Sequence, residues 1–148
     1  MNRLALLIST FGCVGFFPFA PGTAGSLAAL ALYGLIRIGG PAVEAAAIAA
    51  VFAAGVWASA RAEALLGASD PGPVVIDEVM GMLITLFLNP VGWIGALVAF
   101  LLFRLFDVIK PYPANRLELL PGGVGVMADD GMAAIYANLT LRVMLNIG

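Results

Sequence analysis

Acidic residues that could bind a metal ion stand in two separate segments of the chain. They are Asp70, Asp77 and Glu78 in the first segment, and Asp129 and Asp130 in the second. The chain has no histidine and a single cysteine, which excludes a His-ligated zinc site and a Ser-His-Asp triad. Oxygen ligands alone favour Mg²⁺ or a similar hard cation. Taken by themselves, Asp77 and Glu78 are also typical of acids that complement a helix dipole.

Three charged residues in the segment that leads to the second acidic pair could act beside it. Arg104, Asp107 and Lys110 recur every three residues, so they should drift slowly along one face of a helix. The same spacing is also typical of a solvated helix face with intrahelical ion pairs. A geometric limit applies to the first segment: neighbouring residues point about 100° apart on a helix. Asp77 and Glu78 should therefore face one ion only if a helix begins between them.

An uncharged segment rich in glycine and hydroxyl groups precedes both acidic segments. Gly22, Thr23, Gly25 and Ser26 form the pattern G-T-x-G-S at the predicted start of a helix. The exposed N–H groups and two hydroxyls of such a start could hold a phosphate, although Thr and Ser are also ordinary N-cap residues. Together, the acidic pairs, the cations and this helix start match the parts needed for metal-assisted phosphoryl transfer.

The amino-acid composition indicates the environment in which these charged and polar groups lie. Of the 148 residues, 62% are hydrophobic and only 11% are charged, whereas a water-soluble domain usually carries about 25% charged residues. We therefore expect one membrane-embedded domain over residues 1–148. The net charge of −2 and the absence of a basic stripe argue against nucleic acid as a partner.

Glycine and proline positions divide the chain into predicted helices. Helices are predicted at residues 26–38, 41–66 and 126–147, with a flexible turn at Gly122–Gly125 before the last one. The apolar run 79–103 should break at Asn89-Pro90, because a straight span would put the two acidic segments on opposite membrane faces. The expected fold is all-α: a small polytopic membrane bundle with short, partly re-entrant helices.

Several phosphoryl-transfer classes are excluded by single positions. A cysteine phosphatase needs Cys-x5-Arg, but Phe19 stands six residues after Cys13. No Asp-x-Asp pair exists for an aspartyl phosphatase, and Ile135 replaces the arginine that the CDP-alcohol phosphotransferase signature requires.

The sequence closely resembles the phosphatidylglycerophosphatase A family. The resemblance covers most of the chain and rests on A-P-G-T-A-G-S-L at 20–27, D-P-G at 70–72 with V-I-D-E-V-M-G at 75–81, F-R-L-F-D-V-I-K-P-Y-P at 103–113, and G-G-V-G-V-M-A-D-D at 122–130. It implies a Mg²⁺-dependent enzyme of the bacterial inner membrane, acting in phospholipid biosynthesis. The implied reaction hydrolyses phosphatidylglycerol phosphate to phosphatidylglycerol and inorganic phosphate. Ala128 and Ala134 depart modestly from the family pattern.

On this interpretation each site residue has an expected role. Asp77, Glu78, Asp129 and Asp130 would hold one or two Mg²⁺ ions, and Asp70 and Asp107 would complete the site. Arg104 as a fork and Lys110 as a point charge would neutralise phosphate oxygens. Thr23 and Ser26, with the helix start at Gly22 and Gly25, would bond the remaining oxygens. The attacking group is either a metal-bound water or an Asp carboxylate.

The break at Asn89-Pro90 also predicts the orientation. It puts five cations on one side of the membrane: Arg3, Arg61, Arg104, Lys110 and Arg116. Arg37 and Arg142 lie opposite, so the positive-inside rule predicts a cytoplasmic active face.

Two alternative functions remain open. The same carboxylate hydrolase could act on another lipid or on a soluble phosphomonoester. A non-catalytic channel or transporter subunit should carry acids at its span centres, but residues 45–60 and 79–103 contain none. The sequence does not indicate an oligomeric state.

Overall fold

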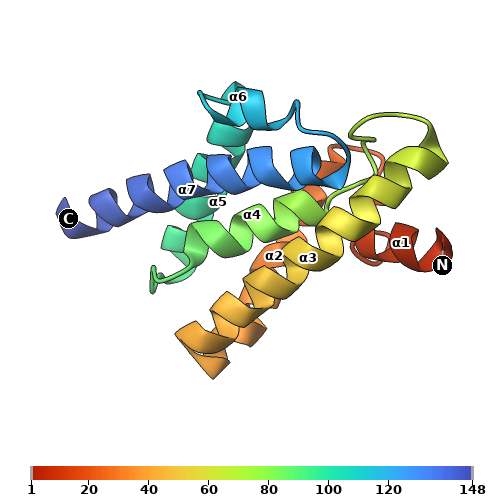
Figure 1. Ribbon diagram of the computed structural model, residues 1–148. Coiled ribbons are helices and arrows are strands. Elements are labelled where there is room, and N and C mark those ends of the chain that lie inside the picture. Colours follow the sequence, from red (N-terminus) through yellow and green to blue (C-terminus); the bar gives the residue numbers. More distant parts are fainter. Residues whose placement is uncertain (1, 148) are drawn as a thin grey trace.

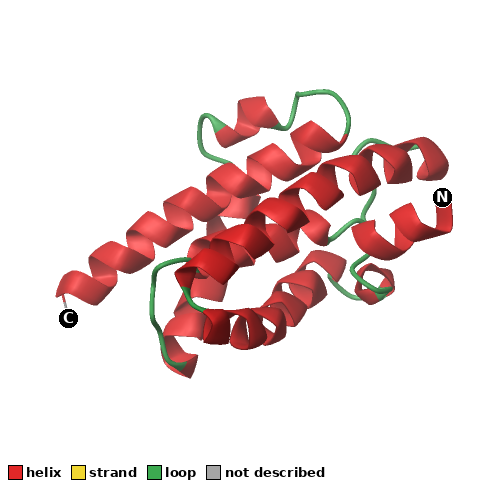
Figure 2. Cartoon of the chain, turned by 60° about the horizontal axis from the view of Figure 1, so that its bottom comes forward, coloured by secondary structure: helices red, strands yellow, loops and turns green. Residues whose placement is uncertain are grey.

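The computed structural model describes residues 2–147, which form helices joined by short turns (Figure 1). The helices are α1 (Asn2–Ser9), η1 (Val14–Phe16), α2 (Pro21–Ile36), η2 (Arg37–Gly39), α3 (Pro41–Leu66), α4 (Ile76–Leu86), α5 (Trp93–Ile109), α6 (Ala114–Leu117) and α7 (Gly123–Ile147). The described residues contain no strand (Figure 2). The all-α fold class is therefore confirmed.

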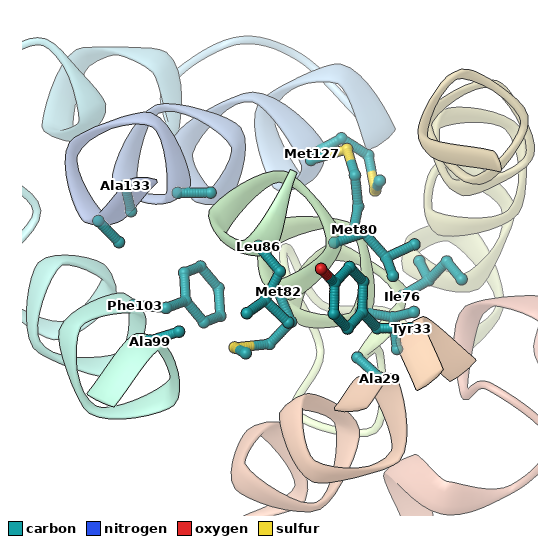
Figure 3. Close-up of a cluster of buried hydrophobic side chains, with 14 of the residues drawn as sticks. Ala29, Tyr33, Ile76, Met80, Met82, Leu86, Ala99, Phe103, Met127 and Ala133 are labelled. Atoms are coloured by element: carbon teal, nitrogen blue, oxygen red, sulfur yellow. The ribbon is translucent and has the colours of Figure 1, made fainter. Parts of the chain in front are cut away.

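Helix α4 forms the centre of the bundle, where α2, α3, α5 and α7 pack around it (Figure 3). Its side chains are buried on almost every side, and Val79, Met82 and Leu86 are fully buried. The fully buried Phe103 of α5 lies against Gly81, where any Cβ atom would collide with the ring. A helix that is apolar all round is typical of such a central position.

Two predicted helix starts are wrong. Helix α2 begins at Pro21 rather than at residue 26, because proline suits the first helical position, where its missing N–H needs no partner. Helix α7 begins at Gly123, so residues 123–125 are helical rather than a flexible turn. Gly123 and Gly125 lack side chains because they lie against backbone carbonyls, those of Val56 and Leu120.

The predicted break between α4 and α5 is confirmed at residues 87–92. Side-chain amides bond the carbonyls that are left free where α4 ends. Asn138 of α7 donates to the carbonyls of Ile84, Thr85 and Phe87 at 2.8–3.0 Å. Asn89 donates to Thr85 as well, at 3.2 Å. This polar joint fixes the end of α4 against α7.

The first turns of α2, α4 and α7 meet at one end of the bundle. Helices α4 and α7 start together and run side by side in the same direction (Figure 1). Gly22 in α2 lies against Glu78 in α4 and near Arg104 in the C-terminal half of α5. The predicted convergence of the three sequence segments is thus confirmed.

Two segments are long and apolar enough to cross a membrane, Pro21–Gly39 and Pro41–Leu66. Large apolar side chains also face outward elsewhere, such as Trp93, which is 79% exposed. These features suggest membrane association.

Candidate active site

Three carboxylates form a compact cluster where α4 and α7 begin. Asp77 and Glu78 lie in the first turn of α4, and Asp130 lies in the second turn of α7. One oxygen atom from each acid lies within 4.8 Å of the others. Helix α4 begins at Ile76, before both adjacent acids, and not between them as the expectation for a shared ion required. Because Asp130 comes from a second helix, the shared point lies between the helices, within reach of both neighbours.

The cluster is buried and lacks hydrogen-bond donors. Asp77 is 5% exposed and Asp130 is 4% exposed. One buried oxygen of each of the three acids, Asp77, Glu78 and Asp130, has no hydrogen-bond partner. Burying unpaired carboxylates is costly, so the cluster calls for a cation. A divalent ion of the Mg²⁺ type fits this set of oxygen atoms.

The starts of α2 and α4 add positive potential around the cluster. The N-terminus of a helix carries roughly half a positive charge, which favours both ionised carboxylates and a bound phosphate. Helix α2 approaches closely only because residue 22 is glycine. A Cβ atom there would collide with the Glu78 carboxylate and lie 3.1 Å from Nη1 of Arg104.

Arg104 lies at the edge of the cluster with its guanidinium partly exposed. Its Nη1 atom is 2.7 Å from Oδ2 of Asp107 and 3.6 Å from Oε1 of Glu78. Asp107 thus contacts the Arg104 guanidinium and also lies beside Asp130 of the three-acid cluster. The guanidinium can present its remaining N–H groups to an anion beside the cluster.

Lys110 is held by two carboxylates. Its Nζ atom lies 2.6 Å from Oδ2 of Asp129 and 2.9 Å from Oε2 of Glu118. Burial alone would lower the pKa of Lys110, but these hydrogen bonds outweigh it and raise the pKa above the ordinary lysine value. Helix α5 ends at Ile109, and Lys110 caps it in a left-handed conformation, so Lys110 lies at the end of the helix that carries Arg104 and Asp107.

Asp70 and Asp129 stand apart from the three-acid cluster. Asp70 follows α3 in a turn, where its N–H donates to Oε1 of Glu63 at 3.0 Å. Burial, and secondly the charge of Asp129, raise the pKa of Asp70. Among the described residues only Asp77, Glu78 and Asp130 form a metal-compatible group.

The G-T-x-G-S residues differ in their surroundings. Gly22 and Thr23 lie in the first turn of α2 and are partly accessible, and Gly22 lies beside Glu78. Ser26 lies a turn later, fully buried, and its Oγ donates to the carbonyl of Gly22 at 2.9 Å. Gly25 packs against Val75. The position of Thr23 therefore suits an anion ligand better than that of Ser26.

Sequence reasoning missed two acids near the site, Glu63 and Glu118. Glu118 pairs with Lys110, and Glu63 receives hydrogen bonds from Ser69 and Asp70. Both are isolated acids in the sequence, without a local pattern that could have indicated these contacts.

Comparison with known proteins places the chain among phosphatases. The family model for phosphatidylglycerophosphatase A matches residues 7–145. A Bacteroides thetaiotaomicron protein named as a candidate phosphatidylinositol-3-phosphatase is 41% identical, and the match covers 95% of this chain and 92% of that protein. Phosphatidylglycerophosphatase A of Haemophilus influenzae is 40% identical, covering 93% and 85%. The Escherichia coli protein of the same name is 33% identical, covering 92% and 80%. No solved structure matches the chain.

Proposed function

Because the chain belongs to the phosphatidylglycerophosphatase A family, we propose that it hydrolyses phosphatidylglycerol phosphate to phosphatidylglycerol and inorganic phosphate, with Mg²⁺ as cofactor. The protein is a phosphatase, and this reaction would serve phospholipid biosynthesis. The observation that carries the proposal is the cluster of Asp77, Glu78 and Asp130, whose buried oxygens lack partners where three helices begin.

Each group around the cluster has a definite task in this reaction. Asp77, Glu78 and Asp130 would hold Mg²⁺, which supplies charge that stabilises the phosphoryl oxygens. Arg104 would orient the phosphate through its free N–H groups, and the first turn of α2 would offer backbone N–H groups and the Thr23 hydroxyl. The ion pair with Lys110 would fix Asp129 beside the site. Binding and orientation would thus come from α2, α4, α5 and α7 together.

A second lipid should be compared as a substrate. The relative from Bacteroides thetaiotaomicron is named for phosphatidylinositol 3-phosphate, another phosphate monoester held at a membrane surface. The carboxylates and Arg104 would bind the phosphate of either lipid in the same way. Selectivity between the two lipids must therefore arise from contacts with the rest of the headgroup.

The membrane arrangement follows from helix lengths and charges. Helices α2 and α3 would cross the bilayer. Helix α4 has 11 residues and spans about 17 Å, which is too short for a hydrocarbon core of about 30 Å. We therefore propose that α4 and α5 form a re-entrant hairpin. The site end carries most of the cations, so it would face the cytoplasm, across the inner membrane from Arg37 and Arg142.

Phosphate release from synthetic lipids tests the activity. Purified protein is incubated with phosphatidylglycerol phosphate, phosphatidylinositol 3-phosphate or soluble glycerol 3-phosphate, each with Mg²⁺ or with EDTA. We expect release from phosphatidylglycerol phosphate that requires Mg²⁺ and exceeds release from the soluble ester. A folded preparation without metal-dependent release from any lipid would refute the proposal.

A further inference from the structure

A small polar cavity of about 20 Å³ lies beside Asp129, outside the three-acid cluster. We call it the polar pocket; the polar side chains that line it are Glu63, Ser69, Asp70, Glu118 and Asp129. Asp129 directly precedes Asp130 of the cluster and is 4% exposed. Asp70 also lies close enough to Asp77, and Asp129 to Asp130, for their charges to interact. The pocket is therefore near the cluster beside which the phosphate is expected to bind.

The polar pocket contains more hydrogen-bond acceptors than donors. Oδ2 of Asp129 accepts from Lys110, while Oδ1 of Asp129 is buried without any partner. The Ser69 hydroxyl and the N–H of Asp70 already donate to Glu63. Buried acceptors are normally satisfied, so the unpartnered oxygen calls for a ligand that brings a donor.

The size and charge of the pocket indicate the kind of donor. A volume of about 20 Å³ holds a group the size of one water molecule. Lys110 already places a positive charge 2.6 Å from Asp129, and the acids of the pocket do not form a metal-compatible group. A neutral hydroxyl group fits this volume and needs no set of acidic ligands. A second divalent cation would lie near the positive charge of Lys110 without a metal-compatible group of ligands.

We propose that the polar pocket binds the headgroup hydroxyl next to the phosphate ester of the substrate, with Oδ1 of Asp129 as its acceptor. This inference rests on the proposed function. In phosphatidylglycerol phosphate the group is the secondary hydroxyl of the headgroup glycerol, on the carbon beside the one that bears the terminal phosphate. Inositol 3-phosphate also has hydroxyls on the carbons beside its ester. The pocket thus defines the substrate class as phosphate monoesters with a neighbouring hydroxyl.

A lipid without that hydroxyl tests the proposal. The analogue carries 1,3-propanediol in place of the headgroup glycerol, and kcat/KM is measured for both lipids. We expect kcat/KM to be roughly tenfold or more lower for the analogue, because the buried oxygen of Asp129 is again left unpaired. Equal values of kcat/KM for the two lipids would overturn the proposal and leave the proposed function standing. Failure to hydrolyse either lipid would refute the proposed function itself.

Two valine variants test whether the preference for the hydroxyl-bearing lipid arises in the polar pocket. Ser69→Val puts methyl groups into the pocket, whereas Ala68→Val adds them at a neighbouring exposed position that does not line it. We expect Ser69→Val to lose most of the preference for the hydroxyl-bearing lipid while still hydrolysing the analogue, which shows that it is folded. Ala68→Val should keep the preference. Loss of the preference in both variants, or in neither, would contradict the assignment.

If a second cation occupied the polar pocket instead of a hydroxyl group, the Mg²⁺ dependence of a Glu63 variant would differ. Glu63→Gln replaces a charged acceptor of the pocket with a neutral amide of the same size. If a hydroxyl binds there, the Mg²⁺ concentration for half-maximal activity stays within about twofold of wild type. A shift of tenfold or more in that concentration would identify a cation in the pocket and overturn the proposal. Phosphatidylinositol 3-phosphate, assayed in parallel, shows whether the pocket admits an inositol hydroxyl.

Discussion

At the scale of single residues, the acids divide into two groups with different partners. Asp77, Glu78 and Asp130 share a point without donors, whereas Asp129 is neutralised by Lys110. Adjacent aspartates on α7 point in different directions, so they belong to different surroundings despite their neighbouring positions. Their substitutions should therefore have different consequences for metal binding.

The first prediction concerns Asp130→Asn. We expect the variant to lose about 100-fold or more in kcat, since a ligand of the charge-stabilising ion is removed. Without Mg²⁺ its melting temperature should be at or above that of wild type, because repulsion among three buried carboxylates is reduced. Mg²⁺ should raise the melting temperature of wild type but not of the variant.

A buried acid at the other end of the bundle provides the control for this measurement. Glu44 is 8% exposed in α3 and lies beside Tyr33, Arg37 and Asn89. Glu44→Gln should keep both the activity and the Mg²⁺-induced shift in melting temperature. An Asp130→Asn variant that still responds to Mg²⁺ would remove Asp130 from the metal site.

At the scale of elements, the closeness of α2 to the cluster depends on one glycine. Gly22→Ala should lower kcat/KM about tenfold or more, because the new methyl group displaces Glu78 and Arg104 from their positions. Gly34 lies in the same helix with open space around its Cβ position. Gly34→Ala should keep the activity and raise the free energy of unfolding by about 0.5–1 kcal/mol. Equal activity of the two variants would show that α2 plays no part in the site.

The polar joint between α4 and α7 should matter for stability and not for chemistry. Asn138→Ala leaves the carbonyls of Ile84, Thr85 and Phe87 without their donor, at the opposite end of α4 from the cluster. We expect a loss of about 1–3 kcal/mol in the free energy of unfolding, measured by thermal or denaturant unfolding in detergent. The specific activity of the folded fraction should stay near wild type. Full stability in this variant would contradict the role of the joint.

The sequence predicts elements best where local signals act alone. Helix α3 has the predicted bounds, because Pro41 can begin a helix and Gly67 adopts the left-handed conformation that ends one. The glycines at 123 and 125 looked like a turn because their role, close contact with other backbone segments, is tertiary. The pairing of Glu118 with Lys110 depends in the same way on how α6 packs, and no local pattern encodes it.

At the scale of the whole molecule, the fold separates the charged groups into two ends. The site end holds the acids of the site with Arg104 and Lys110, while at the far end Arg37 donates to the carbonyl of Val91 in the α4–α5 connection. Arg142 lies beside Asn89 in the same region. Because α2 and α4 both run away from the site, the connection after each of them lies at the far end (Figure 1).

Cysteine labelling tests whether these two ends face opposite sides of a membrane. Cys13, the single cysteine, is exposed and is first replaced by serine. In that background Ala68→Cys and Asn115→Cys mark the site end, and Ile38→Cys, at a position that is 83% exposed, marks the far end.

In intact cells a membrane-impermeant maleimide should label position 38 only. Inverted membrane vesicles should reverse the pattern, because the positive-inside rule places the cation-rich site end in the cytoplasm. Labelling of positions 68 and 115 from opposite sides would contradict the re-entrant hairpin of α4 and α5. Labelling of both from outside would instead reverse the orientation and put the phosphatase site on the periplasmic face.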